Sequence, residues 1–308
     1  MKAVTVKFLN IFKRKKLPMI ERRSGAGKVV FGIFFVIFAL YAFTLLYPLF
    51  WMVLNSFRDT ADYNIAIAVR RTFSLKIVWE FSNYFNVVKL ISTEDASYLG
   101  MFWNSLWMTA VSGALGVFVP TVVAYCLSKY KFKGRNFLYG TAIFSMIMPI
   151  IGNMGAAYQF WGETGLFDTP MFIIISGLGG LGGMHFLIMY GFFKNVPWDY
   201  AEAIFIDGGN DFTVFFRIML PQAFSMLLLF FVMNFMGGWN AYMNYLLMMP
   251  GYPTLATGMY LVSSTLERTG QMPVYYAALI VSMIPLLVLF LIFSDQIFSK
   301  VSISGLKG

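Results

Sequence analysis

Charged residues are scarce in this chain of 308 residues. Only 12% of the residues are charged, whereas soluble globular domains carry about 25%, and 59% of the residues are hydrophobic. This shortage of charge excludes a soluble globular domain. The long uncharged runs also exceed the length of a membrane β-barrel strand, which leaves helices as the spanning elements. We therefore predict an all-α integral membrane protein surrounded by membrane lipid.

Cysteine and histidine are almost absent, with Cys126 and His185 the single residue of each type. One cysteine cannot form an intrachain disulfide, and a lone histidine in an apolar segment favours packing over metal binding. The glycines before Lys28 lack the spacing of a nucleotide-binding loop. We therefore predict no metal site, no catalytic residue, no cofactor in this chain and no nucleic-acid partner, so the chain is not an enzyme.

The apolar segments are essentially free of acidic residues. Carriers driven by protons or sodium usually hold carboxylates near the membrane midplane. Their scarcity indicates that the energy for any transport comes from elsewhere.

Basic residues gather at the start of the chain. Residues 1–28 hold nine basic residues and one acidic residue, a net charge of +8. The uncharged run that follows is too long for a signal peptide, which predicts a retained first span after a basic cytoplasmic segment. We expect a transmembrane domain over 29–298, with six helices near 29–54, 101–128, 137–160, 170–193, 222–247 and 274–296, and a cytoplasmic tail over 299–308.

The loop between the second and third expected spans decides the orientation. Residues 129–135 include four basic and no acidic residues, which is typical of a cytoplasmic loop. By parity, residues 194–221 and both termini are then also cytoplasmic. The uncharged run after Ile218 is long enough for two helices, but a seventh span would place the tail outside. We therefore predict a turn at 250–253 and an external segment over 254–270 that either lies on the surface or re-enters the membrane.

Residues 199–221 combine acidic and large apolar side chains between two membrane spans. The pattern predicts a short helix with Asp199 as its N-cap, a break at Gly208 and Gly209, and a second helix capped by Asn210 or Asp211. Such a segment requires a partner surface, and the alternative is an ordinary interfacial amphipathic loop.

The spacing of Glu202, Ala203 and Gly208 relative to Ile218, Leu220 and Pro221 resembles the signature loop of permease subunits of bacterial binding-protein-dependent ABC importers. Ile204 stands where the family usually has a second alanine. Phe102-x-Asn104-Ser105-Leu106, Trp239-Asn240 and the ending at 304–308 resemble the carbohydrate-uptake branch, in particular the smaller maltose-type permease.

The resemblance implies a type I ABC importer permease fold with six transmembrane helices in the bacterial cell membrane. It also implies three kinds of partner: a second, homologous permease in a heterodimer, two cytoplasmic ATPases that use ATP and Mg²⁺, and an extracellular or periplasmic solute-binding protein. The residues expected to couple to the ATPases are Glu202, Ala203, Asp207, Gly208, Ile218, Leu220 and Pro221.

Polar residues at membrane depth are candidates for a substrate path, because each is costly there unless paired or hydrated. They are Asn104, Asn153, Asn234, Trp239, Asn240, Tyr242 and Asn244. Aromatic rings beside amides suit a sugar, although interhelical hydrogen bonding would explain the same residues. We expect import of a sugar or oligosaccharide. The alternatives are a self-sufficient carrier or channel, or an ABC permease for an amino acid, peptide or polyamine.

Overall fold

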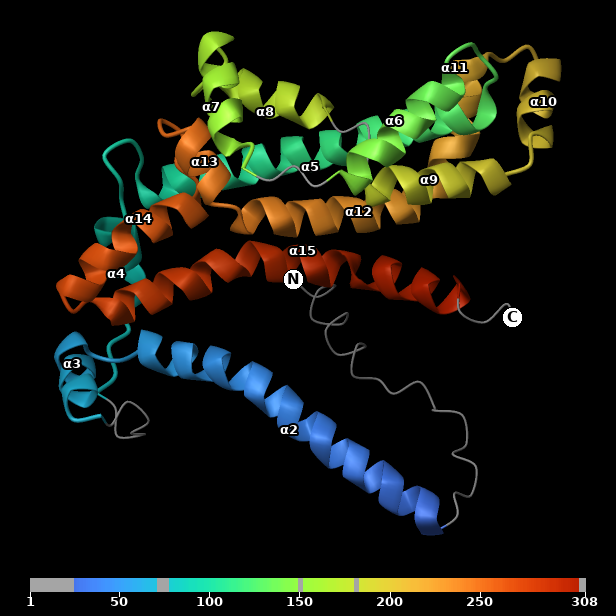
Figure 1. Ribbon diagram of the computed structural model, residues 1–308. Coiled ribbons are helices and arrows are strands. Elements are labelled where there is room, and N and C mark those ends of the chain that lie inside the picture. Colours follow the sequence, from blue (N-terminus) through green and yellow to red (C-terminus); the bar gives the residue numbers. More distant parts are fainter. Residues whose placement is uncertain (1–24, 71–77, 149–151, 180–182, 305–308) are drawn as a thin grey trace. The chain divides into compact units, whose positions relative to one another are not determined.

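The computed structural model describes residues 25–70, 78–148, 152–179 and 183–304 (Figure 1). Within these ranges the chain is helical, with turns and two isolated β-bridges and no β-strand. The expectation of an all-α protein is confirmed. Most of the basic segment 1–28 and the last four residues of the tail lie outside the described residues.

The helices follow one another closely along the chain. In order they are α2 (Gly25–Ser56), α3 (Thr60–Ala68), α4 (Asn83–Leu90), α5 (Tyr98–Lys129), α6 (Arg135–Ile147), α7 (Met154–Glu163), α8 (Pro170–Leu178), α9 (Met184–Asn195), α10 (Asp199–Ile206), α11 (Asp211–Val214), the π-helix η1 (Phe215–Met219), α12 (Leu220–Asn240), α13 (Met243–Met248), α14 (Leu255–Arg268) and α15 (Met272–Ser304).

The chain forms two compact units, Met1–Leu54 and Asn55–Gly308. The described part of the first unit is the helix α2 alone. Its apolar side chains, such as Phe35 and Phe38, are exposed within the chain, as expected of a helix whose surroundings are lipid or another protein.

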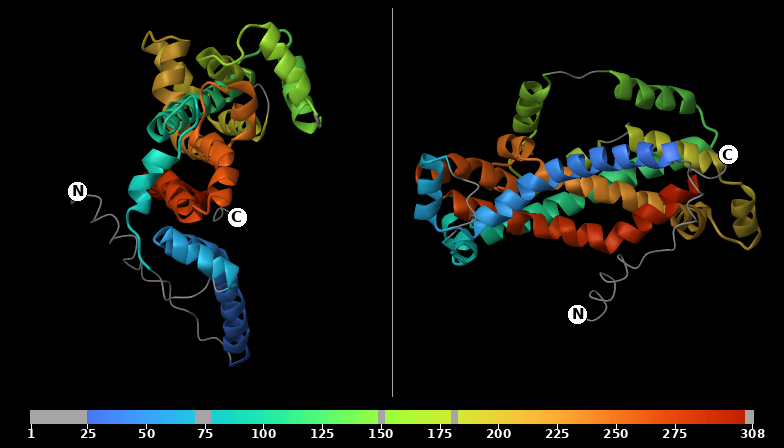
Figure 2. Two further views of the ribbon diagram at one scale, coloured as in Figure 1. Left: turned by 90° about the vertical axis from the view of Figure 1, so that its left-hand side faces the viewer. Right: turned by 90° about the horizontal axis from the view of Figure 1, so that it is seen from below.

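The second unit is built around α5. This helix packs against α8, α9 and α12, and α12 in turn packs against α15. The long helices α5, α12 and α15 run alongside one another (Figure 1 and Figure 2). One buried cluster, with Tyr125, Phe193 and Phe215, lies near the C-terminal end of α5. Another, with Tyr98, Trp239 and Met259, lies near its N-terminal end.

Four helical stretches among the described residues are long and apolar enough to span a membrane: Gly27–Ser56, Tyr98–Lys129, Asp211–Asn240 and Met272–Ser294. They correspond to the first, second, fifth and sixth expected spans. The fifth helix ends earlier than expected, because the backbone at Ala241 becomes extended and α13 follows as a separate helix.

The third and fourth expected spans are each divided into two shorter helices. Gly152, with φ +74°, precedes α7, and Gly183, with φ +103°, precedes α9. A right-handed helix cannot continue through a left-handed residue, so continuous helices over 137–160 and 170–193 are not formed. Pro149 in the third expected span, and Gly180 and Gly182 in the fourth, lie outside the described residues.

The segment 254–270 forms the helix α14, preceded by the expected turn over 250–253. The Thr254 side chain caps α14 by accepting from the Thr257 backbone amide. The helix packs on α5 and α15. Its start is held to α5 by a hydrogen bond of 2.7 Å from the Leu255 backbone amide to the Ser105 hydroxyl oxygen.

Candidate functional site

The expected coupling segment, residues 199–221, contains a sharp glycine turn between α10 and α11. The backbone amide of Gly209 donates to the Ile204 carbonyl at 2.8 Å, and that of Gly208 donates to the Phe205 carbonyl at 3.1 Å. This pair of bonds is a Schellman motif, which satisfies the last carbonyl groups of a helix. Gly208 has φ +79°, so the motif requires a residue that tolerates the left-handed region.

The two helices of the segment begin differently from one another. Asn210 caps α11, because its side-chain oxygen accepts from the Thr213 backbone amide at 2.9 Å. The prediction that Asp199 caps α10 was wrong. Trp198 occupies the N-cap position, and Asp199 is the first helical residue. The Trp198 backbone is already in the helical region and its carbonyl accepts from the Ala201 backbone amide at 2.7 Å, so the helical hydrogen bonds begin one residue before Asp199.

The end of the signature lies inside a continuous helical run from Asp211 to Asn240. Ile218 lies in η1, and Leu220 and Pro221 are the first residues of α12. The Leu220 backbone amide donates to the Phe215 carbonyl in the π-helical pattern, and Pro221, which directly follows, has no N–H group to donate. The Leu-Pro pair therefore marks where the π-helical turn gives way to the long α-helix.

The segment presents a mixed apolar and acidic surface. Ile206 is 86% exposed and Phe212 is 74% exposed. The predicted coupling residues divide by exposure: Glu202, Ala203, Asp207, Gly208 and Pro221 are exposed, whereas Ile218 and Leu220 are half-buried. Beneath this surface, the fully buried Ala201 and Met219 anchor the segment to the core cluster around Tyr125. Large apolar side chains that remain exposed beside carboxylates indicate a docking surface.

The C-terminal end of α5 holds the beginning of the segment. The Lys129 ammonium donates a hydrogen bond to the Val196 carbonyl. The same ammonium lies 5.8 Å from the centroid of the Trp198 ring, within the range of a cation–π contact. Both contacts fix the residues immediately before α10.

Tyr130, which directly follows α5, contacts the middle of the segment 199–221. Its hydroxyl donates to the Asp211 carboxylate at 2.7 Å and lies 3.1 Å from the Tyr125 hydroxyl. Burial raises the pKa of Tyr130, and its bonds to Tyr125 and Asp211 raise it further, so the hydroxyl remains a donor at neutral pH. Lys129 and Tyr130 thus tie α5 to the segment on both sides of α10.

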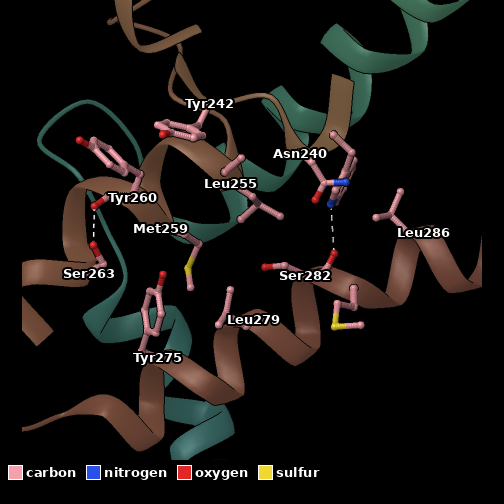
Figure 3. A pocket seen from close by; sticks show the side chains of 13 residues that line it. Asn240, Tyr242, Leu255, Met259, Tyr260, Ser263, Tyr275, Leu279, Ser282 and Leu286 are labelled. Carbon is pink, nitrogen blue, oxygen red and sulfur yellow. Dashed lines mark hydrogen bonds between the residues drawn. The ribbon is translucent and has the colours of Figure 1, made fainter. Parts of the chain in front are cut away.

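The predicted substrate-path residues fall into two groups. Trp239, Asn240 and Tyr242 come together in one pocket of about 320 Å³ between the end of α12, α14 and α15 (Figure 3). The Trp239 indole is buried, stacks on Phe235 with ring centroids 5.7 Å apart, and donates to the Ser282 carbonyl at 3.1 Å. Its ring therefore forms the wall of the pocket and ties α12 to α15.

The other four candidates lie outside this pocket. The Asn104 amide donates to the Pro253 carbonyl at 3.1 Å and so holds the turn before α14. Asn234 is half-buried on α12, with its side-chain amide close to Gly116 of α5. Asn153 precedes α7 and Asn244 lies on α13, and both are exposed.

No group of three histidine, cysteine or acidic residues suited to a metal ion is present in the described ranges. The single histidine lies against an aromatic ring, with the His185 and Phe230 centroids 4.3 Å apart.

Comparison with known proteins assigns these features to a family. Residues 116–303 match the family model described as binding-protein-dependent transport system inner membrane component. The chain belongs to this family. The match covers both the 199–221 segment and the pocket.

Individual relatives agree with this assignment. The permease is 25% identical over 265 residues to the diacetylchitobiose uptake system permease protein NgcG of Streptomyces coelicolor, covering 85% of this chain and 84% of that protein. It is 25% identical over 285 residues to the maltose/maltodextrin transport system permease protein MalG of Vibrio vulnificus, covering 88% and 94% of the two chains.

The fold is also found in a solved structure. A chain of a bacterial ABC transporter involved in the import of the acidic polysaccharide alginate aligns with a TM-score of 0.71 at 20% identity, covering 91% of the permease and 99% of that chain. The family match and the two named relatives confirm the resemblance to carbohydrate-uptake permeases.

Several residues of the permease were not recognised from its sequence. The sequence places Lys129 and Tyr130 in a basic loop and indicates no contact with the segment 199–221. It likewise does not identify Tyr260 and Tyr275 as pocket residues. The sequence signal for the first pair is weak, because nothing local indicates that Tyr130 meets Asp211, 81 residues away. Tyrosines clustered on both sides of the 250–253 turn were a stronger signal for the second pair.

Proposed function

We propose that this permease is the membrane subunit of an ATP-driven importer of an oligosaccharide or a related sugar. In this proposal an external binding protein delivers the sugar, two cytoplasmic ATPases supply the energy, and a second homologous permease completes the path. ATP and Mg²⁺ bind only to the ATPases.

The observation that carries the proposal is the surface of residues 199–221 and its attachment to α5. An exposed apolar and acidic surface would be costly in water unless a partner covers it. Lys129 and Tyr130 connect that surface directly to a helix long enough to cross the membrane. This arrangement supports transmission of a partner's movement into the membrane helices.

Charge supports a cytoplasmic position for this end. The basic loop 129–135 begins at Lys129 and Tyr130, which contact the coupling segment, so both lie at the same end of the second unit. The positive-inside rule places such a loop in the cytoplasm, where an ATPase could reach the segment.

The proposed topology retains six crossings. Each of the pairs α6–α7 and α8–α9 is taken as one interrupted crossing, in addition to the four long apolar helices. Interrupted helices are tolerated in membranes where other helices cover the break. Both termini then lie in the cytoplasm.

The sugar assignment is drawn from the relatives. NgcG and MalG are described as permeases for diacetylchitobiose and for maltose or maltodextrin. The aromatic and amide side chains of the pocket are compatible with such substrates.

The proposal is tested by isolating the tagged permease under mild conditions from its host and identifying the proteins that remain bound. We expect a nucleotide-binding ATPase and a second permease. The variant Ile206→Ser should lose the ATPase while retaining the second permease. Phe85→Ser on α4, which removes a residue of similar exposure (76% against 86%), is the control and should retain both.

Two results would contradict the proposal. If the permease purified alone and transported sugar into liposomes without ATP, it would be a self-sufficient carrier. If Ile206→Ser retained the ATPase as well as Phe85→Ser does, the segment would not be the docking surface.

A further inference from the structure

The pocket at the end of α12 has an aromatic lining drawn from three helical segments. Tyr242 follows α12, Tyr260 lies on α14 and Tyr275 lies on α15 (Figure 3). The rings of Tyr242 and Tyr260 stack with centroids 4.7 Å apart and planes inclined by 26°. Each ring in a stacked pair covers one face of the other, which leaves the outer faces as apolar surfaces for a bound molecule.

Polar groups are interspersed among these rings. The hydroxyl groups of Tyr242, Tyr260 and Tyr275 have no hydrogen-bond partner within the described part of the chain. Each hydroxyl can therefore both donate to and accept from a bound molecule.

The remaining polar groups offer oxygens as acceptors. Ser263 donates to the Tyr260 carbonyl and Ser282 to the Ala278 carbonyl, each at 2.7 Å, so their oxygen atoms can act only as acceptors. The Ser282 oxygen also lies 3.4 Å from the Tyr98 hydroxyl, which uses part of its accepting capacity. The Asn240 amide nitrogen donates to the Met236 carbonyl at 2.8 Å, which leaves its side-chain oxygen and its second N–H group for a bound molecule.

The lining holds no acidic or basic side chain. Its thirteen residues carry only aliphatic, aromatic, thioether, hydroxyl or amide side chains. A charged group placed here would lose water without gaining a counter-ion, which is strongly unfavourable. The composition therefore selects against an acidic sugar.

We propose that this pocket is a binding subsite for a neutral sugar unit of the transported oligosaccharide. The inference rests on the proposed import function and adds a location and a charge preference to it. Sugar rings combine an apolar C–H face with outward hydroxyl groups, which matches alternating aromatic faces and unpaired hydroxyls. A lipid acyl chain fits less well, because it would leave the three tyrosine hydroxyls unpaired.

The volume limits how much of the sugar is held. Ligand pockets commonly enclose about 300–1,000 Å³, and this one encloses about 320 Å³. It therefore accommodates a short part of the oligosaccharide, and the rest extends away from the pocket.

The test is uptake of radiolabelled trisaccharides by host cells that carry the complete transporter. The probes are three neutral sugars, maltotriose, cellotriose and chitotriose, and the acidic trimannuronate. We expect the wild-type cells to take up at least one neutral probe and not trimannuronate.

Two variants examine the pocket itself. Tyr275→Phe removes one hydroxyl and preserves the ring, and should lower uptake of the neutral probe about two- to tenfold, the loss expected for one hydrogen bond of about 0.5–1.5 kcal/mol. Tyr260→Ala removes the stacked ring and should lower uptake by about tenfold or more. Tyr158→Ala on α7 is the matched control, since Tyr158 and Tyr260 are 48% and 49% exposed, and should leave uptake unchanged.

ATP hydrolysis stimulated by the binding protein separates a lost sugar contact from a folding defect. It should be preserved in Tyr275→Phe and Tyr260→Ala, because the pocket lies apart from residues 199–221. Loss of uptake with preserved hydrolysis supports the subsite.

Three outcomes would overturn it. Uptake in both pocket variants equal to that of Tyr158→Ala would exclude a sugar contact, and uptake of trimannuronate alone would exclude the neutral preference. A phospholipid that co-purifies with the wild-type complex and is lost from Tyr260→Ala, with uptake unchanged, would assign the pocket to lipid. Failure of the wild type to take up any probe, together with isolation of the permease without an ATPase, would instead refute the import function on which the subsite depends.

Discussion

The Tyr130 hydroxyl donates a hydrogen bond of 2.7 Å to the Asp211 carboxylate. Tyr130 directly follows the C-terminus of α5, and Asp211 is the first residue of α11. The bond therefore joins a membrane-spanning helix to the segment that we assign to the ATPase interface. Hydrogen bonds to a charged group are stronger than those between neutral groups, so this bond joins the two segments more firmly than a neutral pair would.

Removal of this bond should weaken coupling without unfolding the protein. Tyr130→Phe preserves the ring and its edge-to-face contact with Trp198, which has ring centroids 6.0 Å apart, and removes only the hydroxyl. We expect uptake per ATP hydrolysed to fall about two- to tenfold. The measurement is sugar uptake and ATP hydrolysis by the reconstituted transporter. The control is Tyr139→Phe, which removes a hydroxyl from a ring that packs on Tyr190. If both substitutions lowered uptake per ATP hydrolysed equally, the hydroxyl of Tyr130 would have no special role in coupling.

The turn after α10 should depend on backbone conformation rather than on space. A Cβ atom at Gly208 would meet nothing within 4 Å, yet the residue has φ +79°. Asparagine tolerates this region, whereas a β-branched residue is disfavoured by about 1–2 kcal/mol or more. We expect Gly208→Asn to retain most of the uptake activity and Gly208→Val to lose it. Uptake assays with membrane abundance as a reference would check this order, and equal activity in the two variants would show that the turn is not required.

Replacement of two neighbouring glycines in α12 by alanine should affect the stability of the protein differently. A Cβ atom at Gly238 would lie 2.7 Å from Thr109 Cγ2 on α5, whereas one at Gly237 would meet nothing within 4 Å. The Thr109 hydroxyl donates to the Ser105 carbonyl, so this side chain is not free to turn away. Gly238→Ala should destabilise the protein by about 1–3 kcal/mol through overpacking.

Gly237→Ala is the matched control for that change and should be neutral or slightly stabilising. Thermal unfolding of the purified chain in detergent would compare the two variants. A lower midpoint for Gly237→Ala than for Gly238→Ala would contradict the close packing of α5 and α12.

The buried arginine at the start of the second unit should be sensitive to loss of its partner. Arg58 is 1% exposed and forms an ion pair with Asp62. A second contact, from its guanidinium to the Asn55 side-chain oxygen, is long at 3.4 Å. Removal of the carboxylate leaves a buried cation incompletely paired, so Asp62→Ala should destabilise the protein by about 1–3 kcal/mol. Asp95→Ala changes an exposed acidic residue and should have little effect in the same unfolding measurement.

Much of the coupling segment could be predicted from local sequence. The break at Gly208 and Gly209 and the cap at Asn210 are confirmed, because turn and cap chemistry depends on residues within a few positions of one another. The predicted N-cap of α10, Asp199, was wrong by one residue, because Trp198 occupies that position. A contact from outside the segment, between Lys129 and Trp198, fixes where α10 begins, and no local pattern contains it.

The sequence by itself determined the membrane class, four of the six expected spans as long apolar helices, and the glycine turn within 199–221. These features follow from hydrophobicity, charge and turn residues, which act over short stretches of chain. Only the tertiary structure decided that Tyr130 meets Asp211, and that Tyr242, Tyr260 and Tyr275 line one pocket. Those relationships depend on the rotation and packing of whole helices against one another, which many distant side chains determine together.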